Sequence, residues 1–334
     1  MRNTEFMDKK RFFPLDFLRV IALFCIIWCH TNNIEYDSLL FEKFKWFLGK
    51  CGVPIFFMLS GYLAFPFKGD IKEYILKKSK RILIPFFIWI VIYVFVAWDL
   101  GFNLFAGDLL NKASAHLWFI YVIVGLYLLV PILSPFLENA VQNILKFYLM
   151  IWGITSIYPL LFSITNTTFT EHNIMYTLYY FYGFIGFFVL GYYFKRFPNT
   201  KLLKIPTSIA LIILTFLLIG SYFYMFDCHT VEISDYKGLP MILYSIAVFA
   251  LFKNIALHIQ NGFVIKIMTS LSINSFGIYL VHMLIVFYIY PIIPVFDSIP
   301  DIIVTFYFVL INLLLSYLLV SLMRKIKYSN YLLG

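Results

Sequence analysis

Long apolar runs follow one another along almost the whole chain, each about as long as a membrane-spanning helix. A helix needs about 20 apolar residues to cross the hydrocarbon core of a bilayer, and ten such runs occur within the 334 residues. Only 13% of the residues are charged, against about 25% in soluble domains. These features exclude a soluble, disordered or secreted disulfide-rich chain. The runs are centred near Phe24, Phe57, Ile90, Leu126, Gly153, Phe184, Leu214, Val248, Leu280 and Leu310.

The gaps between the apolar runs are too short to hold a soluble domain. The longest gap has fewer than about 20 residues, and no proline-, glycine- or serine-rich linker and no repeat of fixed period occurs. The sequence therefore predicts one all-α domain over residues 1–334. This domain is a polytopic integral membrane protein with about ten transmembrane helices.

Positive charges alternate between the gaps. With the N-terminus placed in the cytoplasm, 20 of the 26 Lys and Arg residues fall in inner segments and 5 in outer segments, while Arg19 lies inside the first span. Cytoplasmic loops carry such an excess, so both termini are predicted to be cytoplasmic. The net charge of +9 is interpreted as a topology signal beside anionic lipid. We expect a multi-pass protein of the plasma (inner) membrane, with membrane lipid but no nucleic acid among its partners.

One cluster of Lys and Arg residues is denser than the membrane orientation of the chain requires. Four cations occur within five residues at the cytoplasmic mouth of the third span. Clustered Lys and Arg side chains suit phosphate groups, so the sequence predicts a phosphate-binding site there. The four residues are Lys77, Lys78, Lys80 and Arg81.

The first span carries three ionisable residues, Asp16, Arg19 and His30. At 100° per residue all three share one helical face, with Arg19 and His30 about 16 Å apart along the axis. Ionisable side chains inside a membrane usually mark a function. Two simpler interpretations remain: Asp16 and Arg19 form a local ion pair, and His30 is an interfacial histidine without chemistry.

Two further histidines are expected at the level of the first one. The ninth span places Ser275, Tyr279 and His282 on one helical face, and His116 opens the fourth span from the external side. The sequence does not tell whether the three histidines share a cavity. For His116 and His282, a structural hydrogen bond is the alternative to a catalytic role. Because no Cys or His spacing typical of a metal site occurs, no metal is expected.

Five motifs occur in the order found in one known family. They are LDFLRVIALFCIIWCH (15–30, with Arg-x10-His), VPIFFMLSGYL (53–63), Lys78 and Arg81 followed by Pro85, HLWFIYVIVGLYLLVPIL (116–133) and SFGIYLVH (275–282). Together they resemble membrane-bound acyltransferase family 3, the O-acyltransferases, along the whole chain.

The resemblance implies a ten-helix membrane enzyme that uses cytoplasmic acyl-CoA, usually acetyl-CoA with succinyl as the alternative. The acceptor would be a carbohydrate hydroxyl of a cell-surface or lipid-linked glycan. His30 would match the catalytic histidine, and Arg19 the arginine of the same motif. Where the family commonly has Arg-x-x-Arg, this chain has Lys78 first, and lysine supplies a cation without bidentate phosphate recognition.

Acyl transfer to a hydroxyl needs a donor site, a base and stabilisation of the oxyanion. We expect the phosphates of acetyl-CoA at Lys78 and Arg81, with Lys77 and Lys80 assisting by charge. The pantetheine arm would then extend along the face that bears Arg19.

The remaining catalytic roles follow from this arrangement. His30 would be the general base or, as the alternative, an acyl-carrying nucleophile. Asp16 would orient Arg19, and His282 or Tyr279 would orient His30 or donate to the oxyanion. The acceptor is expected beside His116, Trp118 and Asn33.

A transporter or flippase of a glycan or small solute is the alternative from another class. No inverted repeat and no pair of Gly/Pro-broken spans appears, and a basic mouth combined with Arg-x10-His suits a CoA donor. The sequence therefore favours the enzyme. A structural or sensor domain, the third interpretation, predicts that His30 can be replaced without loss. The acceptor glycan, the side of the membrane on which it is modified and the oligomeric state stay open.

Overall fold

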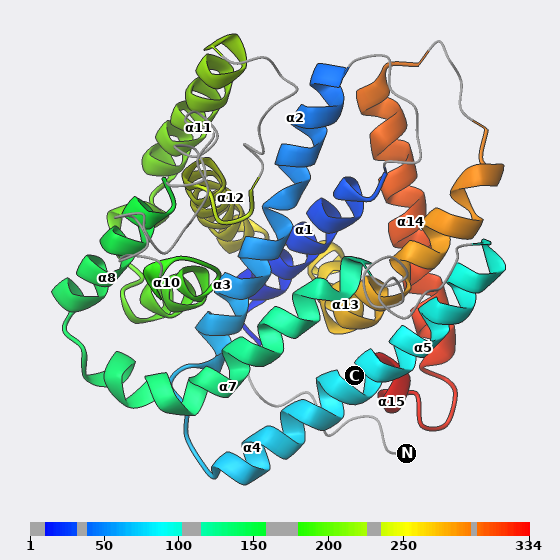
Figure 1. Ribbon diagram of the computed structural model, residues 1–334, viewed down its shortest axis with the longest axis horizontal. Helices are drawn as coiled ribbons and strands as arrows, with labels where there is room; N and C mark the ends of the chain where they lie inside the picture. The colour runs from blue at the N-terminus through cyan, green and yellow to red at the C-terminus, as the bar shows by residue number, and fades with distance from the viewer. Residues whose placement is uncertain (1–10, 32–38, 102–114, 158–179, 226–234, 295–298) are drawn as a thin grey trace, which may run out of the picture.

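The computed structural model describes residues 11–31, 39–101, 115–157, 180–225, 235–294 and 299–334. These residues form helices joined by turns with no strand among them, which confirms the all-α class (Figure 1). The first half contains α1 (Phe13–Cys29), α2 (Leu39–Lys50), α3 (Gly52–Ala64), α4 (Ile71–Lys78), the π-helical turn η1 (Ser79–Leu83), α5 (Ile84–Asp99), η2 (Ala115–Leu117), α7 (Trp118–Asn139) and α8 (Gln142–Thr155). The second half contains α10 (Ile185–Arg196), η4 (Lys201–Leu203), α11 (Ile205–Met225), α12 (Leu239–His258), α13 (Gly262–Tyr288), η5 (Tyr290–Ile292), α14 (Asp301–Met323) and α15 (Asn330–Leu333).

Six helical stretches in the described ranges are long and apolar enough to cross a membrane. The helices α1, α8 and α10 are shorter, with 17, 14 and 12 residues. Each predicted run has its centre inside a helix, except that Phe184 is the N-cap of α10. Ten crossings and cytoplasmic termini remain predictions. The six stretches are Phe41–Ala64, Ile71–Asp99, Trp118–Asn139, Leu239–His258, Gly262–Ile292 and Asp301–Met323.

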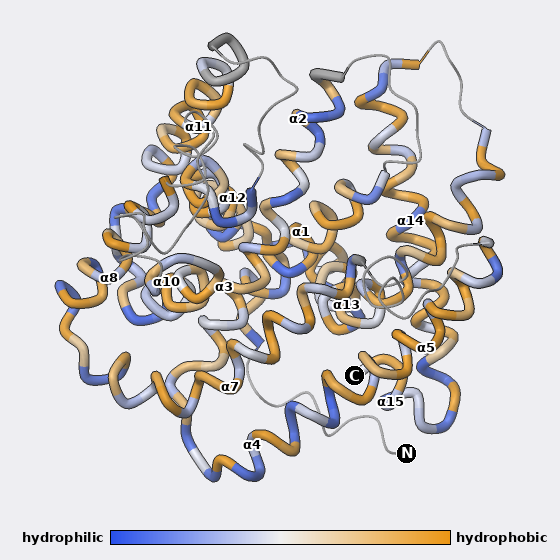
Figure 2. Tube along the Cα trace, in the orientation of Figure 1, coloured by the Kyte–Doolittle hydropathy of each residue, from blue (hydrophilic) through white to orange (hydrophobic). Residues whose placement is uncertain are grey.

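The outer surface of several helices is apolar. Phe95 on α5 is 62% exposed, and Ile132 on α7 is 70% exposed. Figure 2 shows hydrophobic residues along most of α5, α7 and α14. Exposing a continuous apolar surface of this kind to water is unfavourable, whereas contact with the hydrocarbon of a bilayer is not. The chain is a multi-pass membrane protein.

The first helix, α1, lies near the middle of the bundle (Figure 1). It packs against α2, α3, α12, α13 and α14, and most of its side chains are buried, including ionisable Asp16. A 17-residue helix is about 26 Å long. The two ends of α1 therefore present their polar residues at two different levels of the bundle.

Two glycines bring α3 and α10 into close contact. A Cβ added to Gly61 would lie 1.8 Å from the backbone oxygen of Phe188, and a Cβ added to Gly191 would lie 1.8 Å from that of Met58. Small residues permit such close helix packing in membranes. The LSG sequence of α3 is explained by this contact.

Candidate active site

A pocket of about 360 Å³ lies beside α1, α3, α7 and α13. Among the described residues that line it, four have cationic side chains and none is Asp or Glu: Arg11, Arg19, Lys78 and Arg81. We call it the basic pocket. Its net positive charge suits a polyanionic ligand.

The predicted cation cluster divides between this pocket and the surface. Lys78, at the end of α4, and Arg81, in the π-helical turn η1, line the pocket. Lys77 and Lys80 are exposed and are not among its lining residues. The Nζ atom of Lys78 lies 3.7 Å from the ring centroid of Tyr127. This cation–π contact positions the ammonium group against a neutral ring.

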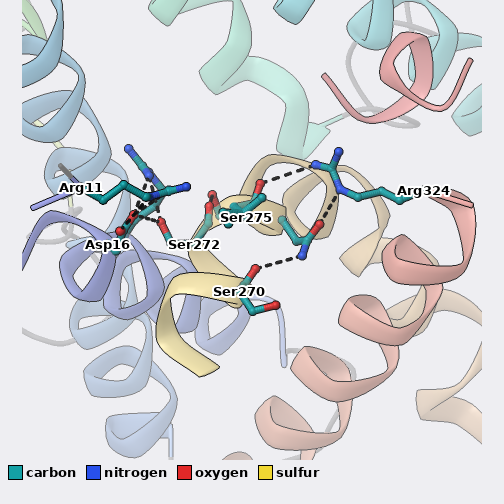
Figure 3. A network of polar contacts seen from close by, with 9 residues as sticks. Arg11, Asp16, Ser270, Ser272, Ser275 and Arg324 are labelled. Atoms are coloured by element: carbon teal, nitrogen blue, oxygen red, sulfur yellow. Dashed lines mark hydrogen bonds and ion pairs between the residues drawn. The ribbon is translucent and has the colours of Figure 1, made fainter. Parts of the chain in front are cut away.

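Asp16 connects α1 to α13 through polar contacts (Figure 3), and its partners Arg11, Arg19 and Ser272 line the basic pocket. Its carboxylate accepts hydrogen bonds from Arg11 at 3.0 and 3.2 Å and from Arg19 at 3.4 Å. The hydroxyl of Ser272 donates to Asp16 at 2.6 Å and accepts from Arg19 at 2.9 Å. One carboxylate thus faces two guanidinium groups, which leaves the local charge positive.

The same turn of α13 also contacts the end of α14. Arg324 donates from Nε to Oδ1 of Asn274 at 2.5 Å, and Asn274 donates to the backbone oxygen of Ser270 at 2.9 Å (Figure 3). Residues 270–275 of α13 therefore fix the basic pocket between the first and last long helices of the chain.

A second cavity, of about 350 Å³, lies at the other end of α1. His30, the C-cap of α1, and His116 of η2 both line it. We call it the histidine cavity. The predicted acceptor residues His116 and Trp118 line it, whereas Asn33 lies outside the described residues. The aromatic residues Trp46 and Tyr236 and the cation Lys50 also line it.

Three imidazole rings meet at this level. The ring centroids of His30 and His282 are 5.1 Å apart, those of His116 and His282 are 5.3 Å apart, and those of His30 and His116 are 6.4 Å apart. Despite this cluster, no group of three or more His, Cys, Asp or Glu residues in the described ranges could hold a metal ion.

The tautomer of His282 follows from its hydrogen bond. Nδ1 lies 2.6 Å from the backbone oxygen of Tyr279, and a carbonyl oxygen can only accept, so Nδ1 carries the proton. In the neutral ring Nε2 is then a hydrogen-bond acceptor. The Nε2 atoms of His282 and His116 are buried and have no hydrogen-bond partner among the described residues. No hydrogen bond among the described residues therefore uses these two nitrogen atoms.

Tyr279 links the two other histidines to each other. Its hydroxyl donates to the backbone oxygen of His116, while its own backbone oxygen accepts from His282. The side chain is 5% exposed. The hydroxyl bond, made in a buried environment, holds this ring in a fixed position.

The two cavities meet at one pair of residues. Among the described lining residues, only Phe119 and Tyr279 belong to both. Their rings lie 5.8 Å apart in an edge-to-face arrangement. We call this pair the junction.

Three helices connect the two levels. Each of these helices has one residue at the basic end and one at the histidine end. At the basic end lie Arg19 of α1, Ser272 of α13 and Tyr127 of α7. At the histidine end lie His30 of α1, His282 of α13 and His116, which directly precedes α7. The contacts of Ser272 with Arg19 and of His282 with His30 show that α1 and α13 run in the same direction. The levels are about 16 Å apart along α1.

Sequence reasoning missed several residues of this arrangement. Arg11 and Ser272 complete the basic pocket, and Phe119 forms half of the junction. Ser272 precedes Ser275 by three residues and Tyr279 by seven, so helical periodicity already placed it on their face. No comparable signal marked Phe119, because its role depends on which helices meet around it.

The fold and the site define a multi-pass membrane protein with a basic pocket that meets a histidine cavity. A family model described as an acyltransferase domain, that of acyltransferase family 3, matches residues 14–321. The chain therefore belongs to acyltransferase family 3, which confirms the resemblance seen in its motifs. No curated protein and no solved structure matches the chain.

Proposed function

We propose that this protein is a plasma-membrane O-acyltransferase that moves an acetyl group from cytoplasmic acetyl-CoA to a hydroxyl of a cell-surface or lipid-linked glycan. The basic pocket binds the donor, the histidine cavity admits the acceptor, and His30 is the general base. Family membership supports acyl transfer, and the geometry of the two cavities supports the remaining assignments.

One observation carries this proposal: the basic pocket and the histidine cavity share Phe119 and Tyr279. A donor with phosphates at one end and a thioester at the other needs an anion site and a reaction site that adjoin. The two cavities provide both, separated by one pair of side chains.

The donor site uses the cations that line the basic pocket. Arg81 and Lys78 contact the phosphates, and Arg19 lies deeper, beside the path of the pantetheine arm. The charge-assisted bonds of Arg to phosphate are the strong ones. Lys77 and Lys80, which are exposed, raise the local positive potential without touching the donor.

The chemical step takes place at His30. The imidazole removes the proton of the acceptor hydroxyl while the hydroxyl oxygen attacks the thioester carbonyl carbon. A new carbon–oxygen bond forms, the carbon–sulfur bond breaks, and the proton passes from His30 to the departing thiolate. The unpartnered Nε2 of His282, whose ring centroid lies 5.1 Å from that of His30, is the acceptor that orients the base in the reacting complex.

The acceptor binds among the aromatic residues of the histidine cavity. Trp46, Trp118 and Tyr236 line this cavity, and the ring of Trp118 lies 5.1 Å from that of Tyr236. Aromatic faces suit the apolar faces of sugar rings, and His116 adds a polar atom at the same level.

The test uses protein reconstituted in vesicles with membrane glycans and radiolabelled acetyl-CoA. Label reaching the glycan fraction supports the proposal, and His30→Ala lowers this transfer by about 10²–10⁴-fold, as expected for a general base. His258→Ala serves as the control, because His258 is an exposed histidine at the end of α12. Unlabelled glycan crossing the vesicle membrane without acyl transfer supports the transporter instead.

A further inference from the structure

The junction between the two cavities has one fixed side and one that is not fixed by polar bonds. The ring of Tyr279 is held by the hydrogen bond from its hydroxyl to the backbone oxygen of His116. Phe119 has no polar side-chain atom and is positioned by ring contacts with Phe57 at 4.9 Å, Phe56 at 6.0 Å and Tyr279 at 5.8 Å.

Phe119 stands at the point where α7 passes from one cavity to the other. His116 and Trp118 of the same segment line the histidine cavity, and Tyr127, two turns further along, lines the basic pocket. The Phe119 side chain is 9% exposed. On the proposed donor path, a group that moves from the cations to His30 meets this ring and Tyr279, the two described residues that line both cavities.

We infer that Phe119 is a specificity-determining residue that limits the width of the acyl group delivered to His30. This inference rests on the proposed acyl transfer. Because the two rings are in edge-to-face contact, a passing acyl group has to displace the Phe119 ring. A slender group such as acetyl needs a smaller displacement than a group branched next to the carbonyl carbon. Phe119 is the ring that moves, because the hydroxyl of Tyr279 is hydrogen-bonded to the backbone of His116.

Width and length of the acyl group are separable in experiment. Isobutyryl-CoA is branched beside its carbonyl carbon, while butyryl-CoA has the same number of carbons in a straight chain. A limit at the junction discriminates between these isomers. A limit set by the depth of the histidine cavity acts on chain length instead.

The experiment measures kcat/KM for acetyl-, butyryl- and isobutyryl-CoA with reconstituted wild type, Phe119→Leu and Phe119→Ala. The ratio of isobutyryl to acetyl is expected to rise about tenfold or more in Phe119→Ala, the scale on which an apolar pocket discriminates a carbon group. A ratio of two donors does not depend on the fraction of folded enzyme, so partial misfolding leaves it interpretable.

Two further variants sharpen the test. Phe119→Trp narrows the junction and is expected to lower kcat for acetyl-CoA at least about tenfold. Phe187→Leu is the matched control, because Phe187 is a fully buried phenylalanine of α10 that lines neither cavity. Its donor ratios are expected to equal those of the wild type.

The outcomes separate this inference from the proposed function. Wild-type transfer with unchanged isomer ratios in Phe119→Ala and Phe119→Leu overturns the inference and leaves the acyltransferase intact. Absence of transfer from every donor in the wild type overturns both.

Discussion

Ser272 donates a hydrogen bond of 2.6 Å from its hydroxyl to Oδ1 of Asp16 and thereby fastens α13 to α1 at the basic pocket. The same hydroxyl accepts a hydrogen bond from Arg19. A single small side chain thus holds both the carboxylate and the deepest arginine of the proposed donor site.

Replacing Ser272 with alanine is expected to destabilise the protein and to weaken donor binding. Asp16 is buried, and loss of one of its partners costs about 1–3 kcal/mol. Thermal unfolding in detergent measures the stability, and KM for acetyl-CoA is expected to rise several-fold. Ser270→Ala is the control, because Ser270 lies on the same helix as Ser272 but bonds to Tyr317 of α14 and does not line the pocket. Equal effects of both variants would contradict the role given to Ser272.

Replacing Lys78 and replacing Lys77 are expected to change the donor KM to very different extents, although the two residues are neighbours in sequence. Lys78 lines the basic pocket, while Lys77 is exposed. A charge-assisted hydrogen bond contributes about 1.5–3 kcal/mol, so Lys78→Met is expected to raise donor KM by about tenfold or more. Lys77→Met is expected to change it less than twofold. The same donor KM in both variants would remove Lys78 from the donor site.

His282 is expected to act on turnover and not on donor affinity. It touches His30 at the histidine cavity and lies away from the cations that bind phosphates. His282→Phe keeps a ring but removes both nitrogens, so kcat is expected to fall by on the order of tenfold or more. This decrease is smaller than the ~10²–10⁴-fold decrease expected when the general base itself is lost.

Steady-state kinetics of His282→Phe and His258→Phe separate an effect on kcat from an effect on donor KM. Donor KM is expected to stay within twofold in His282→Phe, and His258→Phe, altered at an exposed histidine, is expected to match the wild type. A pure rise in donor KM with unchanged kcat would assign His282 to donor binding.

Gly61 is expected to be intolerant of any side chain. A Cβ at this position would lie 1.8 Å from backbone of α10, and overpacking of this kind costs about 1–3 kcal/mol. Gly61→Ala should therefore unfold at lower temperature than the wild type. Gly125→Ala is the matched control, because nothing lies within 4 Å of a Cβ placed on that glycine of α7. Equal stability of both variants would refute the close contact of α3 and α10.

Sequence periodicity predicted much of what lies on a single helix. It placed Arg19 and His30 on one face of α1, and the structure places these residues at two cavities that adjoin. The family motif, and not periodicity, singled out Lys78 and Arg81 as the phosphate-binding pair, with Lys77 and Lys80 assisting by charge. Periodicity alone does not separate the two pairs, because the residues of each pair are three apart. The π-helical turn over residues 79–83 also changes the helical phase locally.

Contacts between helices were beyond the reach of the sequence. The apolar runs gave helix positions but not neighbours, so the bond between Ser272 and Asp16, 256 residues apart, left no local signal. The meeting of three histidines depends on α1 and α13 running parallel and on η2 lying beside their ends. Phe119 had no feature that distinguished it from the other phenylalanines until both cavities were in place.

The most direct test of the account is an experimental structure of the His30→Ala variant with acetyl-CoA bound. The account predicts the phosphates at Lys78 and Arg81, the pantetheine arm between Phe119 and Tyr279, and the acetyl group in the histidine cavity. A nucleotide bound away from these cations, or an arm lying outside the bundle with the junction closed to it, would contradict the account.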